Sequence, residues 1–479
     1  FSPSHIQLNS ISRSFSSVVV MLLDRIHFSR DITSELLKIA LPMVVSQGTF
    51  AVMIFTDRYF MSQIDPIHMA AALGGGVACF FSFCFFSGLF SYSNAMSAQY
   101  LGSGEYKKCA KVVTQGFIMV VLSIPLLILI TVAVSSLFGA MGHDPTLIDL
   151  EQRYYKLLML GVVITLAKVC VSSYFAGIAR TKVVMICDVC GLILNIPLCY
   201  AMVFGRFGFP EMGIEGAALS TIISTLFAFI LFMMFYLAKE HREKFHVLES
   251  FHFDKGIFKR FLRLGAPSGV EIFLNVAAFN LFLLMFQGYG IAEAASAAIV
   301  FNWDILSFVP MIGINIGIIS LIGRFVGARD LEHANAVMTA GFILALSYSA
   351  VLALIFITFR FPLVEVFAPP QGDFSDIREM AGYMMVGLSC YAMADALILV
   401  SGGVLRGAGD TAWLMKVSTF LHWAMLVAQY FVIRVFEFGP KVSWVVFCLL
   451  IVSIAVVLMY RLRQGHWRDA DALDRVMAE

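Results

Sequence analysis

Six ionisable side chains lie inside long apolar segments of this chain, where a charge is costly and usually faces a cavity or a partner. They are Asp57, Lys168, Asp188, Glu271, Asp304 and Asp395. Asp395 has no lysine or arginine within ten positions on either side. Its carboxyl is therefore expected to be neutral or exposed to a water-filled cavity, and both states suit coupling to protons or sodium ions. Tyr391 precedes Asp395 by one helical turn and could hydrogen-bond the same carboxyl.

A second polar stripe follows a proline. Glu271 lies four residues after Pro267, and a helical proline leaves a carbonyl on the preceding turn without its partner. Asn275 lies one turn further on, so the two side chains share a helix face. A carboxylate and an amide oxygen are hard ligands for a small cation, and with Asp395 they form a candidate sodium site. The alternative is a polar contact between helices, which membrane bundles use freely.

The remaining intramembrane charges allow simpler interpretations. Asp57 is a candidate ion-coupling residue, and the alternative is an interfacial ion pair with its neighbour Arg58. Lys168 and Asp188 are expected to pair or to extend toward the membrane surface. Asp304 is expected near the outer interface.

The sequence lacks the motifs of soluble catalysis. It contains no G-x-x-x-x-G-K-[ST], H-E-x-x-H or G-x-S-x-G pattern and no polar segment long enough for a nucleotide-binding domain. Cys187 and Cys190 form a C-x-x-C with no second pair or histidine nearby, so we expect no metal or redox role there. The net charge of +1 does not point to nucleic acid. We expect neither enzyme activity nor a nucleotide or cofactor, so uphill transport would need an ion gradient.

The composition shows which elements must position these groups. Apolar residues make up 60% of the chain and charged residues 14%, against roughly a quarter charged in soluble domains, and the mean hydropathy is +0.86. A helix crosses the hydrocarbon with about 20 apolar residues. Continuous runs of this kind fall at 36–62, 67–97, 110–140, 154–179, 183–205, 214–238, 257–287, 292–322, 334–361, 380–405, 413–436 and 441–460. Because the runs do not alternate as barrel strands do, we predict an all-α polytopic membrane protein of about 12 transmembrane helices.

The two halves of the chain resemble each other. LLKIALP at 36–42 matches FLRLGAP at 261–267, an offset of 225 residues. Gly177 and Thr181 match Gly407 and Thr411 at an offset of 230. Six helices per half give both halves one orientation, related by an axis along the membrane normal. Such repeats are typical of secondary transporters that bind substrate between rocking halves.

The lysines and arginines predict the orientation. If both termini lie on one side, 24 of the 33 basic residues fall on that side and eight on the other. The positive-inside rule then places both termini in the cytoplasm, in the inner or plasma membrane of a cell.

The polar segments suggest the boundaries. We expect an N-terminal tail at 1–32, a first lobe at 33–240, a cytoplasmic linker at 241–256, a second lobe at 257–463 and a cytoplasmic tail at 464–479. Residues 1–20 are rich in serine and lack acids, which is typical either of an organellar transit peptide or of sequence that precedes a true start at Met21.

Several motifs resemble the multidrug and toxic compound extrusion (MATE) transporters, in particular their NorM-like branch. LPMVVSQ with Asp57 resembles the first helix of that family, and SGGVLRGAGDT at 401–411 resembles the junction of helices ten and eleven. Asn195-Ile196-Pro197-Leu198 is similar to the fifth-helix motif, and Asn302 with FVPM at 308–311 resembles the eighth helix. The likeness covers about residues 33–462.

This resemblance implies a two-lobed antiporter that expels organic, often cationic, compounds in exchange for sodium ions or protons. It implies a first-lobe or substrate site with Asp57, Asn195 and Asn302, and a second-lobe cation site with Asp395 and Tyr391. Two departures matter. Cys199 stands where the relatives place a second asparagine, and Asn275 stands where they carry a glutamate. The acid has either moved to Glu271 or been lost, with a change in ion preference.

The expected partners are small molecules and the lipid bilayer, and the chain is expected to act as a monomer. The alternative function is a flippase for a lipid-linked precursor, from the same wider superfamily. A flippase would be expected to line its cavity with cations that meet a pyrophosphate, whereas the interiors of these segments lean acidic.

Overall fold

The computed structural model describes residues 29–140, 144–368 and 374–479, and all regular structure within them is helical. The first lobe contains α2 (Arg30–Ser62), α3 (Pro66–Ser91), α4 (Ser93–Gly102), α5 (Tyr106–Leu137), η1 (Phe138–Ala140), α6 (Pro145–Gly177), α7 (Thr181–Phe204) and α8 (Gly213–Tyr236). The linker contains α9 (Lys239–Phe245) and η2 (Val247–Ser250). The second lobe contains α10 (Lys255–Gln287), α11 (Ile291–Gly327), α12 (Leu331–Thr358), α13 (Arg360–Glu365), α14 (Ser375–Ala408), α15 (Thr411–Tyr430), η3 (Phe431–Val435) and α16 (Pro440–Gln464). After it come η4 (His466–Arg468) and α17 (Ala470–Met477).

The twelve predicted apolar runs all form helices. Among the described residues, eleven spans are long and apolar enough to cross a membrane, and α3 with α4 forms one of them over Ile67–Gly102. The eleventh predicted run forms α15, which is not among these eleven and carries Lys416 and His422. The prediction of an all-helical membrane fold is therefore confirmed. The N-terminal residues that we singled out before Met21 lie outside the described part of the chain.

Side chains at the helix starts explain several boundaries. Asp65, Asp144 and Asp254 each precede a helix and accept a hydrogen bond from its first backbone N–H groups. This arrangement satisfies donors that have no partner within the helix. At the other end, Gly409 stops α14 with a φ of +88°, a conformation that glycine adopts without strain.

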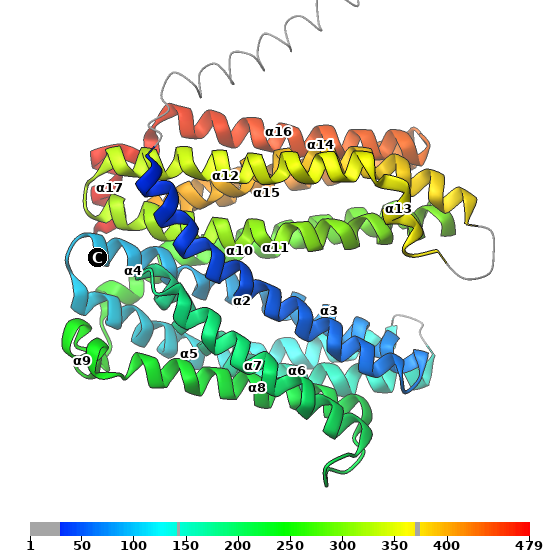
Figure 1. Cartoon of the computed structure of the whole chain (residues 1–479), viewed down its shortest axis with the longest axis horizontal. Helices are drawn as coiled ribbons and strands as arrows, with labels where there is room; N and C mark the ends of the chain where they lie inside the picture. The colour runs from blue at the N-terminus through cyan, green and yellow to red at the C-terminus, as the bar shows by residue number, and fades with distance from the viewer. Residues whose placement is uncertain (1–28, 141–143, 369–373) are drawn as a thin grey trace, which may run out of the picture.

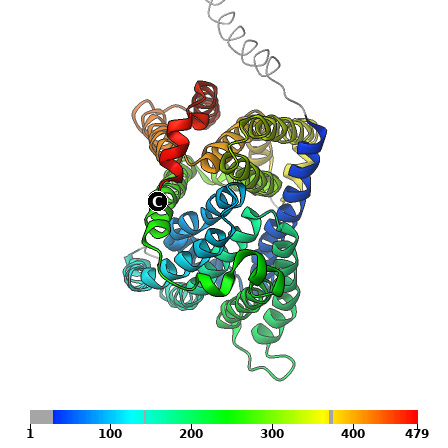
Figure 2. The same cartoon turned by 90° about the vertical axis from the view of Figure 1, so that its left-hand side faces the viewer.

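The two lobes lie side by side and meet at one end of the molecule (Figure 1). This end carries α9 and α17, and we call it the α17 end. The lobes diverge toward the opposite end (Figure 1). Between the lobes, α11 packs on α2 and α4, and α10 packs on α3. Viewed onto the α17 end, the C-terminal helix lies over the junction of the lobes (Figure 2).

Glycines at repeat-related positions bring the lobes into contact at the α17 end. Gly102 of the first lobe and Gly327 of the second are separated by the repeat offset of 225. A Cβ on Gly102 would overlap the carbonyl of Arg324, and one on Gly327 would overlap the carbonyl of Gln99. The two helices approach each other backbone to backbone, as small residues permit in membrane bundles.

The linker is bound to the first lobe. Lys111 of α5 pairs with Asp254 at 2.9 Å, and Gln115 donates to the carbonyl of His252. Although burial of the carboxyl opposes it, the Lys111 ammonium and the N–H of Ile257 hold the pKa of Asp254 below its ordinary value. The start of α10 is thus fixed against the first lobe.

Replacing Gly327 with alanine is expected to lower the melting temperature of the purified protein, because the added methyl group forces the lobes apart. Overpacking of this kind costs about 1–3 kcal/mol. Gly48→Ala in α2 is the control, since a Cβ there meets nothing within 4 Å. A Gly327→Ala protein that melts at or above the wild-type temperature would contradict this packing.

Candidate functional site

Asp57 of α2 is buried in the first lobe among hydrogen-bond donors. Its side chain accepts from the Cys199 thiol at 3.3 Å and from the Thr221 hydroxyl at 2.9 Å. Asn195 in turn donates to the Thr221 oxygen at 3.5 Å. No ion pair joins Asp57 to Arg58, both of which the structure describes, so the interfacial alternative is wrong. Helices α2, α7 and α8 thus converge on one carboxylate.

The sequence analysis had named some residues of this group and not others. The structure brings Asp57 and Asn195 together, as the family resemblance implies. Thr221 was missed, because a threonine in an apolar helix carries no signal of its own. Cys199 substitutes a thiol donor for the amide that we expected from the relatives.

Asn302 does not belong to this group. It lies on α11 of the second lobe, is exposed, and donates to the Ala298 carbonyl of its own helix at 2.7 Å. A backbone carbonyl one turn earlier in the same helix thus accepts from its amide. Its assignment to the first-lobe site is therefore corrected.

The second lobe places two acids near each other. Asp304 of α11 and Asp395 of α14 lie close enough for their charges to influence each other, and both lie near the Tyr391 hydroxyl. That hydroxyl is buried and has no hydrogen-bond partner among the described residues. The Tyr391 ring is 2% exposed and packs edge-on against Trp444 and Phe447. No lysine or arginine forms an ion pair with either acid among the described residues. The sequence indicated only that Asp304 lies toward the outer interface, and it did not indicate that this acid lies near Asp395.

Glu271 has a different environment from Asp395. Its carboxylate pairs with the Arg406 guanidinium at 2.9 Å, with side chains 5% and 18% exposed. Asn275 donates to the Ser418 hydroxyl at 2.9 Å. The predicted sodium ligands therefore fall into two groups. Glu271 contacts α14 and Asn275 contacts α15, whereas Asp395 lies near Asp304.

The first lobe contains a similar ion pair. Lys168 of α6 and Asp188 of α7 are 2.9 Å apart, which confirms their expected pairing, and the Ser46 hydroxyl also donates to Asp188 at 2.5 Å. The internal repeat relates the acid and hydroxyl positions of this group to those around Glu271, but not the two cations, since Lys168 and Arg406 are not at equivalent positions.

At two repeat-related positions, an acid in one lobe stands where the other lobe has a serine hydroxyl. Ser46 corresponds to Glu271 at the offset of 225, and Asp188 corresponds to Ser418 at the offset of 230. In each lobe the fourth helix, α6 or α14, provides the cation. Each lobe thus holds one compensated intramembrane acid.

The described residues contain no group of three histidine, cysteine or acidic side chains that could hold a metal ion. The cysteines Cys187 and Cys190 are free thiols.

A protein-family model described as MatE matches residues 42–201 and 267–430. The two matches begin 225 residues apart, at the repeat offset.

Solved structures share the fold. A MOP superfamily transporter from Pyrococcus furiosus, described as having a binding pocket of reversed polarity, aligns with a TM-score of 0.83 and 18% identity, over 92% of this chain and 100% of that one. A MATE protein in complex with MaL6 aligns with a TM-score of 0.83 and 18% identity, over 93% and 97%. The eukaryotic MATE transporter AtDTX14 aligns with a TM-score of 0.82 and 17% identity, over 93% and 99%.

Replacing Arg406 with methionine is expected to destabilise the protein, because it leaves the buried Glu271 carboxylate without a cation. Breaking a buried pair in this way costs about 3–5 kcal/mol, whereas removing both charges is often neutral. The double variant Glu271→Gln/Arg406→Met should therefore recover most of the melting temperature that Arg406→Met loses. A double variant as unstable as the single one would show that the pair contributes nothing as a pair.

Proposed function

The chain belongs to the MatE family, and from this membership we propose that it exports organic cations by alternating access, in exchange for protons or sodium ions. Members of this family are membrane transporters, and the chain has the helices and the two lobes of one. The substrate class and the coupling ion are the proposed part.

The observation that carries the proposal is the contrast between compensated and uncompensated acids. Lys168 and Arg406 each neutralise one intramembrane acid, Asp188 and Glu271. Asp57, Asp304 and Asp395 have no such partner among the described residues. Ionisable groups of this kind are costly within a membrane, and where they occur they usually mark an ion or substrate pathway.

Two neighbouring carboxylates without a cation between them either share a proton or bind a cation. The pair Asp304–Asp395 can therefore change its occupancy when the site meets solutions of different proton or sodium concentration. Tyr391 offers a hydroxyl next to both acids. We assign ion coupling to this pair. When the pair releases its proton or sodium ion it becomes negatively charged again, and we infer that this charge then attracts the positive group of the substrate.

Asp57 is the intramembrane acid of the first lobe that has no cationic partner among the described residues. Thr221 and Cys199 donate to its two oxygens, which supports a carboxylate that alternates between these donors and an incoming cation. Asp57 could in this way bind a second coupling ion or contact the substrate directly. Glu271 is less suited to coupling than the sequence indicated, because Arg406 already holds its charge.

The distribution of basic residues supports an orientation with the α17 end in the cytoplasm, where α9, α17 and both chain tails would lie. The proposed cycle takes place in one chain within the bilayer. A flippase would need cations that face its cavity, whereas Lys168 and Arg406 within the spans are already paired with acids.

The proposal is tested by efflux of a fluorescent organic cation from proteoliposomes, driven by a proton or a sodium gradient. Asp395→Asn and Asp57→Asn are compared with wild type. We expect Asp395→Asn to bind the dye and to lose at least about tenfold in driven transport, because one decade in rate corresponds to only about 1.4 kcal/mol.

Asp149→Asn is the matched control, since Asp149 forms an exposed ion pair with Arg153 at 2.9 Å. It should transport at the wild-type rate. If neither gradient drives dye transport by the wild type, or if Asp395→Asn and Asp57→Asn both transport normally, the antiporter proposal fails and the flippase becomes the function to test.

A further inference from the structure

Residues 466–479, which we call the tail segment, leave the second lobe after α16 and lie over the α17 end (Figure 2). The segment is anchored on the second lobe in several places. Arg329 forms an ion pair with Asp474, and Val476 packs against Gly409. Arg263 of α10 donates to the carbonyl of Ala478 at 2.7 Å.

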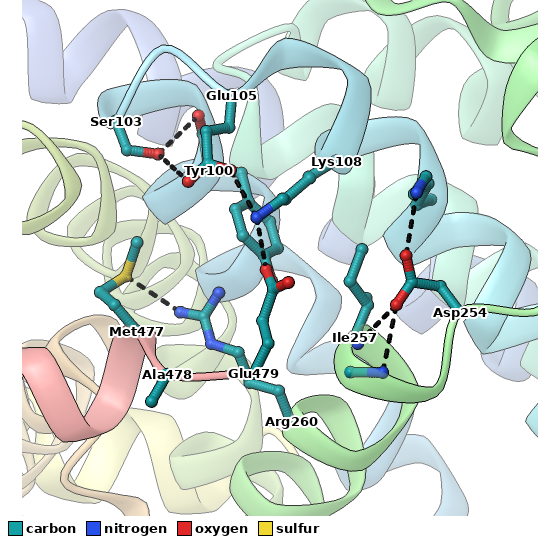
Figure 3. A network of polar contacts seen from close by, with 12 residues as sticks. Tyr100, Ser103, Glu105, Lys108, Asp254, Ile257, Arg260, Met477, Ala478 and Glu479 are labelled. Atoms are coloured by element: carbon teal, nitrogen blue, oxygen red, sulfur yellow. Dashed lines mark hydrogen bonds and ion pairs between the residues drawn. The ribbon is translucent and has the colours of Figure 1, made fainter.

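The same segment also reaches the first lobe. The Glu479 carboxylate accepts a hydrogen bond from the Tyr100 hydroxyl at 2.9 Å and pairs with the Lys108 ammonium at 2.8 Å (Figure 3). Tyr100 lies on α4 and Lys108 on α5, so both partners belong to the first lobe. The tail segment therefore bridges the two lobes.

Beneath the tail segment, Arg260 connects the first lobe, the second lobe and the tail segment. It belongs to α10 of the second lobe and is 1% exposed. Its guanidinium donates to the Gln99 side chain of the first lobe at 2.6 Å and to the Val476 carbonyl of the tail segment at 2.9 Å. It also stacks over the Tyr100 ring at 4.6 Å (Figure 3).

The internal repeat supplies a second contact between the lobes. Arg260 corresponds to Glu35, and Gln99 corresponds to Arg324, both at the offset of 225. Glu35 and Arg324 form an ion pair at 2.8 Å between α2 and α11. This equivalent contact remains partly exposed, at 36% and 26% of the side chains. The contact made by Arg260 is buried and has the tail segment as its third partner.

We propose that the tail segment is a latch that holds the two lobes together at the α17 end and must release the first lobe each time the transporter opens there. The inference rests on the proposed alternating-access cycle.

The tail segment is anchored on the second lobe, and the 2.8 Å contact of Glu479 with Lys108 ties it to the first lobe. If the segment stays with the second lobe, this contact cannot persist when the lobes separate. The buried Arg260 guanidinium would lose Gln99 and Tyr100 in the same movement, so closure at this end is favoured by charge-assisted hydrogen bonds.

The test compares two cross-links made with a reducible thiol-specific linker. Lys108→Cys/Glu479→Cys ties the segment to the first lobe, and Arg329→Cys/Asp474→Cys ties it to the second lobe, where it is already anchored. We expect the first cross-link to reduce dye transport at least tenfold, with recovery after reduction, and the second to leave transport unchanged. Normal transport by the first cross-linked protein would overturn the latch, and so would equal inhibition by both.

A distance measurement tests the latch without transport. Spin labels at Phe207→Cys and Ile291→Cys report on the opposite end of the two lobes, where these residues are 82% and 89% exposed. The labelled protein carries Cys390→Ser, because Cys390 is an exposed thiol. Arg260→Gln and Glu479→Gln should each at least double the fraction of molecules with the shorter distance. Lys259→Gln, an exposed neighbour of Arg260, is the control and should not.

The two experiments separate the proposals. Without a cross-link, both cysteine pairs should transport dye if the proposed function is right. Absence of transport in uncross-linked and wild-type protein would count against the function, and the spin-label distances would still decide on the latch. Unchanged distances in both Arg260→Gln and Glu479→Gln would overturn the latch.

Discussion

The structure depends on how charges are compensated inside an apolar helical bundle. A carboxylate in such surroundings needs a cation, several donors or a mobile ion. Two acids have cations supplied by the fourth helix of each lobe: Asp188 has Lys168 and Glu271 has Arg406. Asp57 accepts hydrogen bonds from neutral donors only, and Asp304 and Asp395 lie near each other without a cation. In the proposed mechanism, the acids without a cationic partner are the ones that take part in transport.

The internal repeat organises both the lobes and their contact. The offset of 225 relates Gly102 to Gly327, where the backbones of the lobes meet, and relates the Glu35–Arg324 ion pair to the Arg260–Gln99 hydrogen bond. The two contacts occupy equivalent positions of the repeat but are formed by different side chains. Both contacts join the lobes, but only the Arg260 copy lies beneath the tail segment, which is the basis of the proposed latch.

The sequence predicted the helices well because a membrane span needs a long apolar run, which one segment shows by itself. It also predicted the pairing of Lys168 with Asp188. It could not show that Asp304 faces Asp395 or that Thr221 bridges Asp57 and Asn195, since these contacts depend on how helices rotate against each other. The sequence did not indicate the partners of Arg406 and Arg260. Arg406 pairs with Glu271, and Arg260 hydrogen-bonds Gln99 of the other lobe.

The central claim is that the Asp304–Asp395 pair holds the coupling ion. Coupling is reciprocal, so a substrate gradient across proteoliposomes without any ion gradient should drive the ion in the opposite direction. Proton- and sodium-sensitive dyes inside the vesicles would record this movement. We predict a signal from one of the two dyes with wild type and its loss with Asp304→Asn/Asp395→Asn, while substrate binding remains. An undiminished ion signal from the double variant would contradict the account.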